Sequence, residues 1–183
     1  MKKLKLAVFL TLLMTALSAH ADMEDGLAAF NLGDFEVAMS EFSSSAQAGE
    51  VAAQVALGFM YSEGKGVLRN YPKAATWYRK AAEQGHVQAQ HNLAVMLLEG
   101  MGVAQDAAEA EKWFQISAGQ GNVELQVGLA RMYFHGTGLT RDYAKAAIWF
   151  RNAAEQGNAE SQSRLGKAYL AGEGVAQDYS EAA

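Results

Sequence analysis

Apolar residues in the segment 50–85 fall on one face of each of two consecutive helical patterns. In the first pattern they stand at offsets 0, 4, 7 and 8, which share one side of an α-helix. These positions are Ala53, Leu57, Met60 and Tyr61. The apolar face of the second pattern consists of Ala74, Trp77, Tyr78 and Ala81. The segment therefore predicts helix A over about 51–63 and helix B ending near Gln84, packed together as a hairpin.

Glycines and short polar residues mark the ends of these helices. Gly64 and Gly66 follow helix A, and Gly85 follows helix B; glycine adopts the positive φ of a tight turn at little cost. A side-chain oxygen at Asn70 is predicted to cap helix B. Its counterparts further along the chain are Asp106, Asp142 and Asp178. Two of them are followed three residues later by a glutamate, which is the spacing of a capping box: Asp106 with Glu109 and Asp178 with Glu181.

The whole hairpin pattern returns every 36 residues without a gap. The tryptophans of helix B are Trp77, Trp113 and Trp149, and the first turn glycines are Gly64, Gly100, Gly136 and Gly172. A fixed period in this range indicates a stack of one supersecondary unit, in which each unit buries its apolar face on its neighbours. The sequence therefore predicts an all-α fold, an α/α solenoid of antiparallel helical hairpins.

The period also predicts how the chain is organised. Residues 50–85, 86–121 and 122–157 are three complete repeats, and 158–183 is a truncated fourth repeat whose helix B is expected to begin near Asp178. Residues 22–49 have the pattern of a degenerate first hairpin, with Gly33-Asp34 in place of the longer glycine turn. The truncation leads us to expect a fragment of a longer array, with a frayed end or a covering chain as alternatives.

These motifs resemble the Sel1-like repeat, a relative of the tetratricopeptide repeat. The resemblance is clearest in Leu57-Gly58-x-x-Tyr61-x-x-Gly64-x-Gly66-Val67 and in the run from Trp77 to Gly85, Trp-Tyr-Arg-Lys-Ala-Ala-Glu-Gln-Gly. It covers residues 50–183. Members of this family scaffold protein–protein contacts, and exported bacterial members are common, so the resemblance implies a protein or peptide partner.

The first 21 residues have the pattern of a Sec-type secretory signal peptide. Three lysines precede an apolar run over residues 6–17, and Ala19-His20-Ala21 provides the small residues of a cleavage site. The run is shorter than the ~20 residues that a spanning helix needs. We therefore expect cleavage after Ala21, no membrane span afterwards, and a periplasmic or secreted location. The chain has no cysteine, which excludes a lipid-anchored cysteine, disulfides and thiolate metal sites.

Charge is distributed unevenly along the predicted mature chain. Between Asp22 and Gly64 there are eight acidic residues and no lysine or arginine, whereas 12 basic and 12 acidic residues follow from Lys65 onward. An acidic end argues against nucleic acid, because binding to nucleic acid depends on neutralising phosphates. Two interpretations stay open, a region that steers a basic partner and a solvated cap on the open end of the stack.

Patterns typical of catalysis or metal binding are not supported. Gly64-Lys65-Gly66 lacks the Lys-Ser/Thr and the preceding strand of a phosphate-binding loop. The ladder of Met60, Met96 and Met132 fits core positions better than a copper site. No histidine pair after residue 21 has i, i+4 spacing, and no Ser or Cys recurs beside a histidine. We therefore predict a non-catalytic protein without metal or cofactor.

Positions that vary between repeats are the candidates for binding, because structural positions recur. On helix A they follow offsets 0, 3, 7 and 11, which form one stripe outside the apolar face. In tetratricopeptide-like stacks helix A lines the concave groove, so by resemblance this stripe faces the ligand. The stripe changes from apolar to basic along the chain, which suits a peptide with an apolar anchor and acidic groups. The candidate residues, called here the helix A stripe, are Val55, Phe59, Gln88, His91, Val95, Glu124, Arg131, His135, Arg164 and Lys167.

Phe59 is the first candidate for an interface hot spot, because aromatic residues and arginine carry much of the binding energy at interfaces. For each stripe residue the alternative is an ordinary solvated surface position. Two alternatives to a binding scaffold also stay open. One is a β-lactam-processing enzyme like the cysteine-rich members of the family, which the absence of cysteine disfavours; the other is a structural module of a longer envelope protein.

Overall fold

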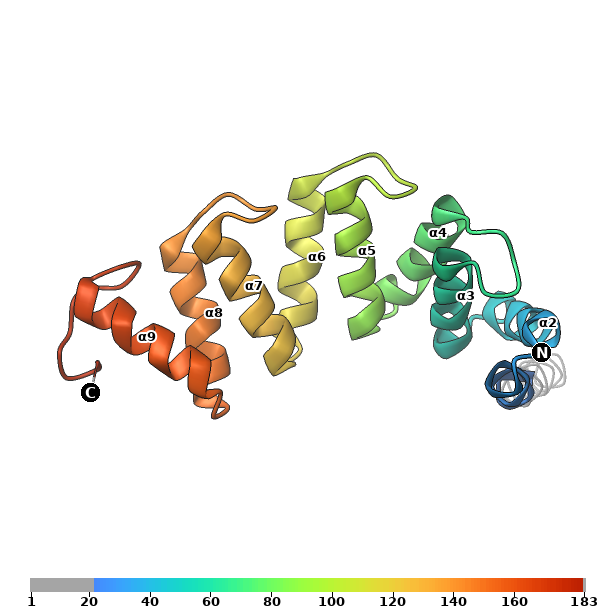
Figure 1. Ribbon diagram of the computed structural model, residues 1–183, viewed down its shortest axis with the longest axis horizontal. Coiled ribbons are helices and arrows are strands. Elements are labelled where there is room, and N and C mark those ends of the chain that lie inside the picture. Colours follow the sequence, from blue (N-terminus) through green and yellow to red (C-terminus); the bar gives the residue numbers. More distant parts are fainter. Residues whose placement is uncertain (1–21, 183) are drawn as a thin grey trace, which may run out of the picture. The chain divides into compact units, whose positions relative to one another are not determined.

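The computed structural model describes residues 22–182, and regular structure in this range is entirely helical (Figure 1). Residues 22–32 are helical, and the helices that follow each contain 13 residues. They are α2 (Phe35–Gln47), α3 (Val51–Glu63), α4 (Tyr71–Glu83), α5 (Val87–Glu99), α6 (Ala107–Gly119), α7 (Val123–His135), α8 (Tyr143–Glu155) and α9 (Ala159–Ala171). The predicted all-α repeat solenoid is confirmed. The predicted signal peptide lies outside the described residues.

The chain divides into two compact units, which are described separately. The N-terminal unit extends to Met96 and includes Gly100–Ala104; the C-terminal unit consists of Leu97–Glu99 and the chain from Gln105 on. In the N-terminal unit α3 lies between α2 and α4 and packs against both (Figure 1). In the C-terminal unit α7 packs against α6 and α8, and α8 also packs against α9. No helix of the described residues combines the length and apolar character needed to cross a lipid bilayer.

Three of the four predicted core positions of the first helix A are buried, and the fourth, Tyr61, is half-buried. In the N-terminal unit Ala53, Leu57 and Met60 are at most 1% exposed and join Phe42 of α2 in one apolar cluster. Their burial explains the offsets in the sequence, since only residues on one side of α3 reach the neighbouring helices. The methionine ladder is mainly a core feature, because Met60 and Met96 are buried and Met132 is half-buried.

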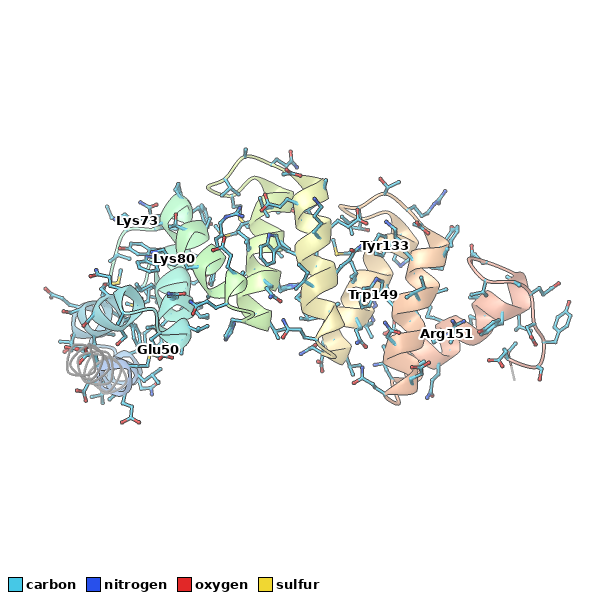
Figure 2. All side chains as sticks on the ribbon, turned by 180° about the vertical axis from the view of Figure 1, so that it is seen from behind. Glu50, Lys73, Lys80, Tyr133, Trp149 and Arg151 are labelled. Atoms are coloured by element: carbon cyan, nitrogen blue, oxygen red, sulfur yellow. The ribbon has the colours of Figure 1, made fainter. Side chains whose placement is uncertain are left out.

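The tryptophans of helix B do not fill the core as expected. Trp77, Trp113 and Trp149 are only half-buried, and the next residue in each helix is the buried one. These buried aromatic residues are Tyr78, Phe114 and Phe150. Consecutive residues point about 100° apart around a helix, so only one of each aromatic pair can face helix A directly. Trp77 instead packs at the edge of the core, with the Lys80 ammonium 4.1 Å from its ring centroid. Lys80 and the equivalent tryptophan Trp149 are labelled in Figure 2.

The predicted caps of helix B are present, although the capping boxes are not formed as predicted. Asn70, Asp106 and Asp142 each accept a hydrogen bond from the backbone N–H three residues later. In a capping box the glutamate side chain would accept a hydrogen bond from the backbone N–H of the capping residue. The N–H of Asp106 instead donates to the Leu97 carbonyl at 2.9 Å. The same bond recurs between Asp178 and Tyr169. It ties the start of the helix B segment to helix A of the same repeat.

The segment after Asp178 differs from the expected helix. Residues 179–182 form a turn, and the Asp178 side chain accepts hydrogen bonds from the N–H groups of Ser180 and Glu181. Forming the first turn of a helix fixes several backbone dihedrals for a single hydrogen bond. A segment of only a few residues therefore gains little free energy by forming a helix.

Recurring glutamines join consecutive repeats, a feature that the sequence analysis did not identify. Each donates its side-chain N–H to a carbonyl eight residues earlier, at the end of the preceding helix B or, for Gln54, of α2. The four glutamines are Gln54, Gln90 and Gln126, which are buried, and Gln162, which is exposed. A buried amide is costly unless it is hydrogen-bonded, and the final carbonyls of a helix lack partners within the helix. The 36-residue recurrence of glutamine was the signal in the sequence.

Candidate binding site

Five stripe residues, carried by α3 and α5, line two adjoining hollows in the N-terminal unit. They are Val55, Phe59, Gln88, His91 and Val95. Phe59 borders both hollows and is 41% exposed. Because Phe59 projects from α3 between the two spaces, its ring is available to a ligand from either side.

The first space, the apolar hollow, has a volume of about 250 Å³. Phe30 and Phe42 form part of its wall, and the Phe30 ring centroid lies 6.2 Å from that of Phe59 in an edge-to-face arrangement. Edge-to-face pairs are favourable because the positive edge of one ring meets the negative face of the other. Leu27 and Phe30 were missed by the sequence analysis, since they lie in the degenerate first hairpin and not in a recurring repeat. The full lining is Leu27, Phe30, Phe42, Val55, Ala56, Phe59, Tyr78, Gln88 and Asn92.

The second space, the polar hollow, has a volume of about 550 Å³. Gln88 donates to Asn92 at 2.9 Å along its rim. Burial raises the pKa of Tyr78, partly offset by hydrogen bonds to Ser62 and Asn92, so its hydroxyl keeps its proton near neutral pH. Desolvation lowers the pKa of His91, which favours the neutral imidazole. The lining is Phe59, Ser62, Glu63, Tyr71, Tyr78, Gln88, His91, Asn92, Val95, Met96 and Met101.

Two stripe residues of the C-terminal unit, Arg131 and Arg164, contact the same carboxylate. The Arg131 guanidinium binds both carboxylate oxygens of Glu160, joining α7 to α9, and this pairing lowers the pKa of Glu160. Arg164 lies 4.0 Å from the same carboxylate and over the Phe134 ring, 5.3 Å from its centroid. The charge of Arg131 is therefore paired within the unit, and Arg164 shares the same carboxylate.

The other stripe residues of this unit are more open to solvent. Glu124, His135 and Lys167 are exposed, and Lys167 makes no ion pair within residues 22–182. The His135 ring rests against Phe134, with 5.0 Å between centroids. Val127 shares the offsets of the stripe but is buried, at 7% exposure. Lys167 lines an open hollow of about 590 Å³ beside α9, whereas neither Glu124 nor His135 lines it.

The polar cluster around Tyr133 in the C-terminal unit was not predicted. The buried Tyr133 hydroxyl donates to Glu111 at 2.7 Å and accepts from Gln115 at 2.8 Å, while the Lys145 ammonium binds the same Glu111 oxygen at 2.7 Å. Figure 2 labels Tyr133. Burial raises the pKa of Tyr133, and the hydrogen bond from Lys145 lowers that of Glu111. Both groups hold their ordinary protonation state at neutral pH, so the cluster joins α6, α7 and α8 and provides no acid–base pair.

The Glu111 carboxylate is expected to make folding depend on acid pH. Its pKa is lower in the folded state than its ordinary value of 4.5, so its contribution is complete above 4.5 and is lost as pH falls through the folded pKa. At pH 7 we expect Glu111→Gln to lower the free energy of unfolding by about 1 kcal/mol, since the pair is partly exposed. Urea unfolding at pH 7 and pH 3 measures this, and the gap between the variant and the parent should narrow at pH 3.

The matched control for that experiment is Glu155→Gln, which removes an exposed carboxylate from the end of α8 in the same unit. It should change stability little at either pH. An equal loss for Glu111→Gln at both pH values would contradict the assigned role of the carboxylate.

In residues 22–182 no group of three histidine, aspartate or glutamate side chains is arranged to hold a metal ion. The class of protein defined by these features is an α/α repeat solenoid with two adjoining hollows in its N-terminal unit. Comparison with known families agrees with this description. The Sel1 repeat matches residues 51–86, 87–122, 123–158 and 159–183. The chain therefore belongs to the Sel1 repeat family, and repeats of this kind generally form scaffolds for protein–protein interaction.

Solved structures of related proteins support the same conclusion. A Sel1 repeat protein from Oxalobacter formigenes is 32% identical, with a TM-score of 0.72 over 85% of this chain and 64% of its own. A protective antigen of uropathogenic Escherichia coli displaying an SLR fold is 35% identical, with a TM-score of 0.70 over 94% of this chain and 46% of its own. This chain thus spans less than two thirds of either relative. The search among curated proteins gave no match.

Proposed function

We propose that this protein is a non-catalytic scaffold of the cell envelope that binds a protein or peptide through the two hollows around Phe59. The observation that carries the proposal is the exposed Phe59 ring, which stands between an apolar hollow and a polar hollow within one compact unit. An aromatic side chain at the centre of a concave surface is the usual form of an interface hot spot. The envelope location rests on the signal-peptide pattern of residues 1–21.

A photoreactive phenylalanine analogue placed at Phe59 tests this function. Exposed to envelope extract and irradiated, the protein should form a defined cross-linked product at this position. Leu68 is the matched control, because its apolar side chain is more exposed, at 92%, than that of Phe59. It lies between α3 and α4 and lines neither hollow. The analogue at Leu68 should give no such product.

Binding measurements with the identified partner complete the test. Phe59→Ala should weaken binding at least fivefold, since truncation of a hot spot costs more than about 1 kcal/mol. Leu68→Ala should leave binding unchanged, and both variants should retain the helical circular dichroism signal. Equal cross-linking at the two positions, or binding insensitive to Phe59→Ala, would remove the support for this site.

A further inference from the structure

The polar hollow carries one uncompensated negative charge. Glu63, the last residue of α3, is exposed and is the only carboxylate among the described residues that line this hollow. Within residues 22–182 it takes part in no ion pair. The nearby His91 does not oppose it, because burial keeps that imidazole neutral. Glu63 is therefore the charged side chain that a ligand group meets in the lining of the polar hollow.

The basic residues that follow Glu63 in the sequence are engaged with aromatic rings. Lys65 lies over Phe35 and Lys73 over Tyr61, with 5.7 and 5.0 Å from the ammonium to the ring centroid. Arg69 lies over Tyr71 at 5.9 Å. Between residues 22 and 64 the charged residues are all acidic. None of these three cations lines the polar hollow, so a cationic ligand group can pair with Glu63 there, in contrast to the acidic ligand groups expected from the arginines of the C-terminal unit.

The spacing along α3 sets the length of a ligand that can reach both hollows. Val55 lines the apolar hollow, Phe59 borders both, and Glu63 lines the polar hollow. These residues are one helical turn apart, so Val55 and Glu63 are separated by about 12 Å along the helix axis. An extended peptide rises about 3.3 Å per residue, and therefore covers this distance in three to four residues. The side-chain amides of Gln88 and Asn92, shared by both hollows, are suited to hydrogen bonds with a peptide backbone.

We propose that the two hollows around Phe59 bind an extended peptide segment with an aliphatic or aromatic residue in the apolar hollow and, three or four residues away, a lysine or arginine beside Glu63. This inference rests on the proposed function and specifies its ligand. The apolar residue supplies the anchor, because the lining of its hollow is almost wholly hydrocarbon. The cation supplies selectivity, since an ion pair at the rim discriminates between ligands more than it adds affinity.

Fluorescein-labelled peptides of eight residues test the proposal. The reference peptide is Ser-Gly-Leu-Ser-Gly-Lys-Ser-Gly, and its two variants carry glutamate in place of lysine or serine in place of leucine. By fluorescence anisotropy the lysine peptide should bind three- to tenfold more tightly than the glutamate peptide. That preference should shrink at high salt, because an exposed ion pair is screened. The serine-for-leucine peptide should lose most of its binding.

A charge reversal in the protein provides the decisive comparison. Glu63→Lys should reverse the preference, so that the glutamate peptide binds more tightly. Glu83→Lys is the matched control, because Glu83 is also an exposed glutamate at the last position of a 13-residue helix but lines neither hollow. It changes the net charge equally and should leave the preference for lysine intact.

Two results would overturn the inference: a preference that survives Glu63→Lys, or no binding of any of the peptides at millimolar concentration. Neither result decides the proposed function, which depends on cross-linking at Phe59. If Phe59 cross-links a partner while the charge reversal has no effect, the scaffold function stands and the ligand chemistry proposed here is wrong.

Discussion

Gly102→Ala is expected to lower the free energy of unfolding by more than about 3 kcal/mol. Gly102 has a φ of +73°, a region in which a Cβ costs roughly 1–2 kcal/mol. A Cβ there would also lie 2.6 Å from the Tyr71 carbonyl oxygen, at the first residue of α4. Backbone atoms cannot rotate away as a side chain can, so the turn and α4 must move apart. Urea unfolding followed by circular dichroism at 222 nm measures the loss.

Gly85→Ala separates the two causes. Gly85 has a φ of +91°, but nothing lies within 4 Å of the position its Cβ would take. Its replacement should therefore cost only the backbone strain, about 1–2 kcal/mol. Equal losses for the two variants would show that close packing against Tyr71 contributes nothing to stability.

The same close approach recurs at other repeats. Gly66 lies against Phe35 and Gly174 against Tyr143, in each case the first residue of a helix that begins 31 positions earlier, whereas Gly138 lies against the Leu98 side chain. Without a Cβ, the turn can contact the helix backbone directly. The recurrence of this glycine is therefore explained by packing between repeats as well as by turn conformation.

Leu129→Ala is expected to lower the free energy of unfolding by about 2–5 kcal/mol, the range found for buried leucines. Leu129 is 2% exposed on α7, which packs against both α6 and α8. Removing its side chain leaves a cavity that surrounding helices cannot fill without moving. Chemical unfolding of the variant and the parent, followed by tryptophan fluorescence and circular dichroism, measures the difference.

Leu165→Ala is the matched comparison, because Leu165 occupies the same repeat position 36 residues later. It is only half-buried and lines an open hollow of about 590 Å³ beside α9. The loss should be about 1–2 kcal/mol, since less apolar area returns to water and solvent can enter the space. A cost equal to that of Leu129→Ala would contradict the difference in packing.

Much of the local structure could be predicted because it depends on neighbouring residues. The bounds of α3 and the caps at Asn70, Asp106 and Asp142 follow from helical periodicity and from hydrogen bonds over three residues. The caps of helix A were missed, although they have the same chemistry. His86, Asn122 and Asn158 each accept a hydrogen bond from the N–H three residues later. Their identity changes between repeats, which hid a position that the repeat analysis could have found.

The candidate site was predicted less completely. Phe59 and its neighbours on α5 were identified because their offsets place them outside the core face. Phe30 was not, because it belongs to the degenerate first hairpin and reaches Phe59 only through packing. Arg131 was identified as a ligand contact, yet its partner Glu160 lies 29 residues away on another helix. Pairings of this kind depend on helix separation and rotation, which periodicity does not specify.

For this protein the sequence alone determined the all-α class, the 36-residue hairpin, the core face of helix A and membership of the repeat family, since each depends on spacing along one chain. Tertiary structure decided which of the equivalent residues are buried: Leu129 is buried, whereas Leu165 is half-buried. It also decided which charges are paired, since Arg131 binds Glu160, whereas Glu63 makes no ion pair within the described residues. It also formed the hollows around Phe59 from residues of different helices. The physical reason is that burial and electrostatic pairing depend on what a neighbouring helix places opposite a side chain, whereas helix formation depends mainly on residues within a few positions.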